Sequence, residues 1–82
     1  MKSEYEENSD RSFPIRTYSK AELAMLYCPN QCITLALNTL YRWMRLNTAL
    51  MAELQSVGYY RFRRSFTPLE VRIIVKYLGE PG

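Results

Sequence analysis

The chain has 82 residues, of which 48% are hydrophobic, and its formal net charge is +3. A chain of this size forms one small domain, and no apolar run approaches the ~20 residues that a membrane-spanning helix needs. The sequence contains no histidine and two cysteines, and its first residues show no apolar secretory segment. We therefore expect a single domain in the cytoplasm, with both thiols free.

The charge is unevenly distributed along the chain. Residues 1–10 hold four acidic residues and one lysine, which gives −3, and residues 11–82 hold ten basic and four acidic residues, which gives +6. A short segment with much charge and little apolar surface rarely folds. Residues 1–12 are therefore predicted to be a disordered acidic tail and residues 13–82 the folded domain. A basic domain favours polyanionic partners such as nucleic acid.

The first predicted helix begins after Ser19. Ser19 and Glu22 have the spacing of a capping box, in which each side chain accepts a hydrogen bond from the other residue's backbone N–H. Three residues at helical spacing form the inward face, Leu23, Leu26 and Tyr27. Pro29 disfavours helical geometry at the residue before it, so it is expected to end the helix.

A second helix is predicted over residues 32–46. Its inward stripe consists of Ile33, Leu37, Leu40 and Met44, flanked by Ala36 and Trp43. Its opposite stripe consists of Thr34, Asn38, Arg42 and Arg45. Short hydrogen-bonding groups followed by guanidinium groups suit base edges and phosphates. A polar stripe of this kind is also typical of solvated surface.

A short third helix and a capped fourth helix follow. Asn47 is expected to cap a helix over residues 48–57, and Gly58 is well placed to end it. The segment 67–70 (TPLE) forms a second capping box with proline at the first helical position. The fourth helix is therefore predicted over residues 68–78.

Residues 59–66 (YYRFRRSF) are predicted to form a short ribbon before the fourth helix. Side chains alternate along an extended chain, so Arg61 and Arg63 are expected to point outward. The inward face would hold Tyr60, Phe62, Arg64 and Phe66, with Arg64 placed to pair with Glu70. An arginine fork makes two charge-assisted hydrogen bonds to a phosphate. Alternatively, the arginines protect an exposed sheet edge from aggregation.

Together these elements predict a mainly α, small winged helix-turn-helix-like domain with four helices and a short β-ribbon. The second helix of a helix-turn-helix lies in the major groove. We therefore expect double-stranded DNA as the partner. The predicted contacts are Thr34, Asn38, Arg42 and Arg45 at base edges and phosphates, and Arg61 and Arg63 at phosphates. Tyr41 and Trp43 are expected to be core or structural support.

The segments 18–27 (YSKAELAMLY), 39–47 (TLYRWMRLN) and 64–81 (RSFTPLEVRIIVKYLGEP) resemble a family of small, uncharacterised proteins of Bacteroides-type bacteria. That family is described only as a domain of unknown function. The resemblance covers nearly everything after residue 12. It implies a bacterial, cytoplasmic protein and no particular mechanism.

The pattern is also similar to the winged helix-turn-helix domains of MerR-type regulators and phage excisionases. The matching residues are Thr39, Leu40, Arg42 and Trp43 in the second helix, Arg63, Arg64 and Phe66 at the wing end, and Glu70 beyond it. This likeness implies a DNA-binding role in transcription regulation or an excisionase-like, architectural role. The turn 28–32 (CPNQC) and the third helix depart from that pattern, and no long dimerisation helix is present.

The sequence contains few residues in patterns typical of catalysis. Cys28 and Cys32 are expected to be buried, and with no histidine they cannot supply four zinc ligands from one chain. The sequence has no glycine-rich phosphate loop and no evident carboxylate pair for acid–base catalysis. We expect no enzyme activity, cofactor, metal or small-molecule substrate.

A second hypothesis places a protein partner on the fourth helix. Leu69, Ile73 and Tyr77 form one apolar stripe, and Val71, Val75 and Leu78 form another. If the small core uses only the first stripe, the second is an exposed patch that marks a homodimer or adaptor interface. If the core uses both stripes, the fourth helix is simply central to the fold.

Overall fold

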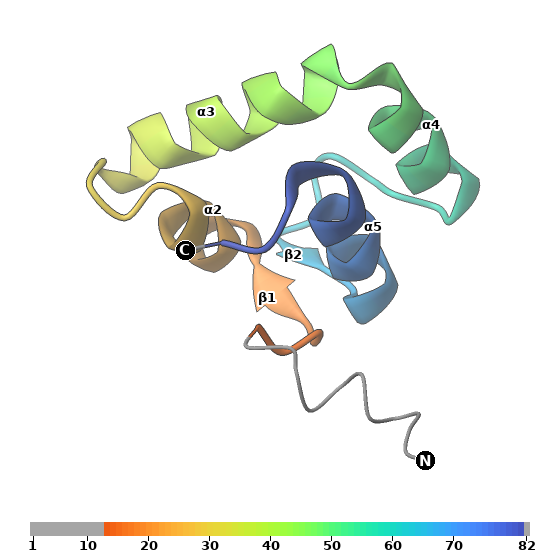
Figure 1. Cartoon of the computed structure of the whole chain (residues 1–82), viewed down its shortest axis with the longest axis horizontal. Coiled ribbons are helices and arrows are strands. Elements are labelled where there is room, and N and C mark those ends of the chain that lie inside the picture. Colours follow the sequence, from red (N-terminus) through yellow and green to blue (C-terminus); the bar gives the residue numbers. More distant parts are fainter. Residues whose placement is uncertain (1–12, 82) are drawn as a thin grey trace.

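The chain forms four helices and a two-stranded antiparallel sheet in the computed structural model, which describes residues 13–81. In chain order the elements are β1 (Tyr18–Ser19), α2 (Lys20–Tyr27), α3 (Ile33–Leu46), α4 (Thr48–Ser56), β2 (Ser65–Phe66) and α5 (Pro68–Leu78) (Figure 1). The predicted mainly α domain with four helices is confirmed for this part of the chain. The predicted acidic tail lies outside the described residues. No described helix combines the length and apolar character that crossing a membrane requires.

The helix starts follow the capping signals of the sequence. The Ser19 Oγ atom accepts a hydrogen bond of 3.0 Å from the Glu22 N–H, and the Glu22 carboxylate accepts one of 3.4 Å from the Ser19 N–H. Thr67 and Glu70 form the same reciprocal box at α5. Asn47 Oδ1 accepts a bond of 3.0 Å from the first turn of α4. These bonds satisfy donors that a helix N-terminus otherwise leaves unpaired.

Gly58 ends α4 and turns the chain into the loop that follows. It has φ of 85°, a left-handed geometry that L-residues with a Cβ atom adopt at a cost. The Gly58 N–H donates to the Gln55 carbonyl and the Tyr59 N–H to the Leu54 carbonyl, each at 3.1 Å. These two bonds are the Schellman arrangement of a helix C-terminus, and they fix where residue 59 leaves the helix.

The sheet differs from the predicted ribbon. β1 and β2 pair with Tyr18 opposite Phe66 and Ser19 opposite Ser65, so the partner strand comes from the segment before α2. Residues 59–60 have no regular structure and residues 61–64 form turns and bends, so no strand occurs there. The predicted alternation of side chains therefore fails there, because it requires an extended backbone. Phe66 is fully buried as expected, whereas Tyr60 and Phe62 are exposed.

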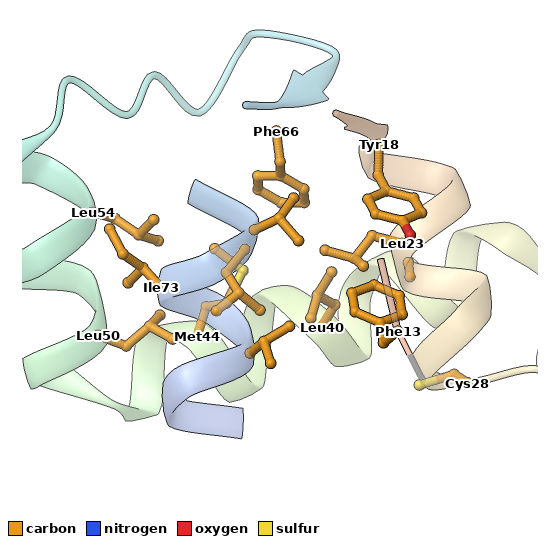
Figure 2. Close-up of a cluster of buried hydrophobic side chains, with 14 of the residues drawn as sticks. Phe13, Tyr18, Leu23, Cys28, Leu40, Met44, Leu50, Leu54, Phe66 and Ile73 are labelled. Atoms are coloured by element: carbon orange, nitrogen blue, oxygen red, sulfur yellow. The ribbon is translucent and has the colours of Figure 1, made fainter. Parts of the chain in front are cut away.

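The core lies between α5 and the other helices. Figure 2 shows α5 surrounded by side chains from α2, α3, α4 and β2. The largest fully buried side chains include Leu23 of α2, Leu40 of α3, Leu54 of α4, Phe66 of β2 and Ile74 of α5. A leucine or phenylalanine buried in this way contributes about 1.5–3 kcal/mol to folding. The four helices are therefore held together mainly by one shared apolar cluster.

Burial overturns the predicted partner face of α5. Val71 and Val75 are buried in the core and Leu78 is half-buried against it. α5 contacts α4 as well as β2, and of its first stripe Ile73 is buried whereas Leu69 is exposed. The second stripe is therefore part of the core and not an exposed interface.

Several positions at the borders of the predicted stripes are also exposed. In α3 the buried stripe is centred on Ala36, Leu40 and Met44, which are one turn apart, and includes Thr39. The predicted core residues that turn out to be exposed are Leu26, Ile33 and Trp43. A small core covers a narrower stripe than the apolar residues of the sequence offer.

Candidate nucleic-acid interface

The outer face of α3 carries the four positions predicted to contact DNA. Thr34, Asn38, Arg42 and Arg45 are all exposed. They lie opposite the buried stripe of the same helix, because residues three and four apart share a helix face. α3 runs along one edge of the molecule, from α2 to α4 (Figure 1). The helix therefore offers a polar and basic stripe, although the exposed side chains of Leu35 and Leu46 lie on the same helix.

Most carboxylates of the domain are already paired with a basic side chain. The ion pairs join Glu22 to Arg16 at 3.3 Å, Glu53 to Lys76 at 3.1 Å, and Glu70 to Arg63. Within residues 13–81, the arginines that make no ion pair are Arg42, Arg45, Arg61, Arg64 and Arg72. Their charge is available to an anionic partner.

Arg63 has a structural role that the sequence did not reveal. Its guanidinium pairs with Glu70, which is only 1% exposed, and its Nε atom donates to the Ser65 carbonyl at 3.2 Å. The bend at residues 63–64 turns Arg63 toward α5 and leaves Arg64 exposed. The prediction that Arg64 pairs with Glu70 is therefore wrong. Arg63 is committed to the fold instead of pointing freely outward as expected.

A groove of about 590 Å³ lies beside the C-terminal half of α3. Its walls come from α3, α4 and the loop after Gly58, and its lining residues are Tyr41, Met44, Arg45, Met51, Gln55, Tyr59, Tyr60, Arg61 and Phe62. Arg45 and Arg61 thus reach the same hollow from different elements. No acidic residue of the described chain lines it. The predicted contacts Arg45 and Arg61 are therefore brought together around a cavity that no sequence pattern indicated.

Most of the chain matches the sequence model of a known protein family. The model of the family described as "Domain of unknown function (DUF4248)" matches residues 14–81. The chain belongs to the DUF4248 family. Both the outer face of α3 and the groove lie within the matched part of this DUF4248 domain. The predicted membership of an unassigned domain family is confirmed, whereas the bacterial origin and the likeness to MerR-type and excisionase domains stay predictions.

No curated protein and no solved structure matches the chain. The family match itself carries no activity or ligand.

Lys20 anchors the loop that forms one wall of the groove in the DUF4248 domain. It is 4% exposed, and its ammonium donates to the Arg61 carbonyl at 2.6 Å and to the Tyr60 carbonyl at 3.5 Å. The same atom lies 4.9 Å from the centre of the Tyr59 ring. Burial lowers the pKa of Lys20, as do the charges of Arg63 and Arg61, while Glu70 opposes them. Nothing in the local sequence distinguishes this lysine from a solvated one.

The loop presents aromatic rings next to Arg61. Tyr60 and Phe62 are 58% and 70% exposed, and their rings meet edge to face with centroids 5.6 Å apart. The Arg61 guanidinium lies 5.1 Å from the centre of the Phe62 ring. Cation–π contacts of this kind hold a guanidinium beside a ring without neutralising its charge.

Residues 13–81 contain no group of three or more histidine, cysteine or acidic side chains able to hold a metal ion. Cys28 is buried and Cys32 is exposed, and both are free thiols. The prediction that both cysteines are buried is therefore wrong for Cys32, which lies just before the first turn of α3.

Proposed function

We propose that the domain binds double-stranded DNA, with the outer face of α3 in the major groove and Arg61 on the phosphate backbone. The observation that carries this proposal is the set of arginines without a carboxylate partner in residues 13–81. Three of them, Arg42, Arg45 and Arg61, lie on α3 and on the loop beside it. Unpaired guanidinium groups on neighbouring elements suit a polyanion, since each can make a bidentate contact to phosphate.

The helical part of the interface follows from the dimensions of α3. Its 14 residues span about 21 Å at 1.5 Å per residue, and a major groove about 12 Å wide admits one helix. Asn38 lies in the middle of the exposed face, where its amide suits the edge of an adenine. Arg42 and Arg45 follow one and two turns later and suit guanine edges or phosphates.

The same reasoning interprets α2 and α3 as a helix-turn-helix. The two helices are in contact and are joined by residues 28–32. In this interpretation the loop 59–64 takes the place of a wing. A role as a small regulator or as an excisionase-like, architectural factor fits this arrangement, and it agrees with the cytoplasmic location that the sequence predicts.

Single arginine-to-alanine substitutions, each of which removes one positive charge, test the proposal. Arg42→Ala and Arg61→Ala should weaken binding to all duplexes and reduce the slope of log K against log salt by about one unit each. Arg72→Ala is the matched control, because Arg72 is exposed and makes no ion pair within residues 13–81 but lies on α5. Equal loss of affinity in all three variants would show that only net charge matters.

Base recognition needs a separate readout. Asn38→Ala should reduce the difference in affinity between preferred and random duplexes by about 1–3 kcal/mol. Binding-site selection followed by fluorescence anisotropy measures that difference. An unchanged sequence preference in the Asn38→Ala variant would refute the proposal that α3 lies in the major groove.

A further inference from the structure

We infer that the groove between α3, α4 and the loop 59–62 binds one unpaired nucleobase and its phosphate. The inference rests on the proposed DNA binding and names a second ligand chemistry for the same surface. A duplex lying along α3 needs an exposed face but no hollow. The groove measures about 590 Å³, which is within the range of about 300–1,000 Å³ of small-molecule sites.

The aromatic side chains of the groove suit a base. Tyr60 and Phe62 leave more than half of their surface exposed, and Tyr59 and Tyr41 also line the groove. Single-stranded nucleic acid is commonly held by stacking its bases on exposed aromatic rings, because every base presents a flat π-face. The groove thus offers rings that an intact duplex, with its bases stacked inside, does not use.

The charges of the groove suit the phosphate that accompanies the base. Arg45 and Arg61 line it from α3 and from the loop, and no acidic residue of the described chain does so. The buried ammonium of Lys20 lies behind the loop and bonds the Arg61 carbonyl. A base stacked on the loop would place its phosphate between two guanidinium groups that no carboxylate neutralises within residues 13–81.

The edge of the base also finds partners in the groove. Gln55 on α4 and Tyr41 on α3 line it, and neither side chain makes a hydrogen bond within residues 13–81. A glutamine amide both donates and accepts, and a tyrosine hydroxyl does the same. These groups can bond the Watson–Crick edge that an unpaired base exposes.

Arg45 connects this groove to the DNA-binding face. It is the last member of the exposed stripe of α3 and at the same time lines the groove. A strand that leaves a duplex held on α3 therefore reaches the groove directly. The exposed rings of Tyr60 and Phe62 beside these arginines favour a nucleic-acid strand over an acidic peptide, because bases present flat faces for stacking.

The test compares three DNA probes by fluorescence anisotropy. The first is a blunt duplex, the second the same duplex with a single-stranded overhang of several thymidines, and the third the same overhang built from abasic nucleotides. The wild-type protein should bind the thymidine overhang more tightly than the other two. Tyr60→Ala should weaken that complex by about 5- to 150-fold per stacked base while leaving blunt-duplex affinity unchanged. Phe62→Ala should weaken it as well, but the Phe62 ring also contacts the Arg61 guanidinium, so Tyr60→Ala is the decisive variant. Leu69→Ala is the control, because Leu69 is an exposed apolar residue of α5 outside the groove.

The outcomes separate this inference from the proposed function. Blunt-duplex binding with no gain from the thymidine overhang overturns the inference and leaves the proposed function standing. An equal gain from the abasic overhang also overturns it, because phosphates alone would then explain the binding. Binding of the duplex with the thymidine overhang, without any binding of the blunt duplex, supports base binding in the groove and refutes duplex recognition by α3. Binding of an acidic peptide and of none of the three DNA probes refutes both.

Discussion

Replacing Arg63 by methionine should destabilise the fold, although Arg63 was predicted to contact phosphate. Loss of one partner of a buried ion pair costs about 3–5 kcal/mol. Two features reduce this cost here. The Arg63 side chain is 36% exposed, and the Glu70 carboxylate still accepts a hydrogen bond of 2.9 Å from the Thr67 N–H. We therefore expect Arg63→Met to lower the free energy of unfolding by about 2 kcal/mol.

Urea unfolding followed by far-UV circular dichroism measures this change. For a domain of this size a loss of about 2 kcal/mol corresponds to a decrease of roughly 8–16 °C in Tm. Arg61→Met is the matched control, because Arg61 makes no ion pair within residues 13–81. Its substitution should change stability by no more than about 0.5 kcal/mol. We therefore expect Arg63 to contribute to folding stability and Arg61 to contribute to DNA binding.

A double-mutant cycle isolates the pair itself. Glu70→Gln retains an oxygen that can accept from the Thr67 N–H and removes the negative charge. The combined Arg63→Met and Glu70→Gln variant should be more stable than the sum of the single effects predicts, by at least about 0.5 kcal/mol. Equal stability of Arg63→Met and Arg61→Met would refute the reasoning, because the pair would then contribute nothing to the fold.

Three further predictions concern the turn after α4 and two titrating side chains. Gly58→Ala should destabilise the protein by about 1–2 kcal/mol in urea unfolding, because Gly58 has φ of 85°. Burial, with a smaller contribution from Glu80, raises the pKa of Tyr27 from 10.0 to about 12, so its contribution to stability is complete below pH 10 and is lost as the pH rises to 12. Tyr27→Phe should therefore flatten that part of the stability–pH curve. Burial lowers the pKa of Lys20 below 10.5, so the unfolded chain binds more protons just below pH 10.5, and stability from this group rises as the pH approaches that value. Lys20→Met should remove this increase of stability with pH. If the urea midpoint of the variant depends on pH as in the wild-type protein, the increase does not come from Lys20.

The helix boundaries could be predicted from the sequence because their signals are local. The reciprocal bonds of Ser19 with Glu22, and of Thr67 with Glu70, each join residues three positions apart. Gly58 likewise determines its turn through its own φ angle. Capping and turn chemistry act within a few residues, so a reader of the chain can identify them without knowing the fold.

The loop before α5 could not be predicted in the same way. The ribbon hypothesis treated residues 59–66 as extended and named no partner strand, whereas the structure pairs Phe66 with Tyr18 from the other end of the described chain. Lys20 then holds the Arg61 carbonyl at the turn. These contacts are non-local, and a sequence pattern contains no information about which distant segment supplies the partner.

The role of α5 was open for a related reason. Its two apolar stripes predict either a core helix or an interface helix, and only the arrangement of its neighbours decides between them. α4 covers one side and β2 lies near its start (Figure 2), so Val71 and Val75 are buried. For the outer face of α3, by contrast, exposure of Asn38 and Arg42 followed directly from helical periodicity.

We propose that the unpaired arginines of α3 and the neighbouring loop meet the phosphates of DNA. The most direct measurement is fluorescence anisotropy of the purified protein with a mixed-sequence duplex of about 30 base pairs at a series of salt concentrations. We predict micromolar or tighter binding at low salt that weakens steeply as salt increases, with a smaller slope for Arg61→Ala than for Arg72→Ala. Absence of binding at low salt would contradict the account and make these arginines solvated surface.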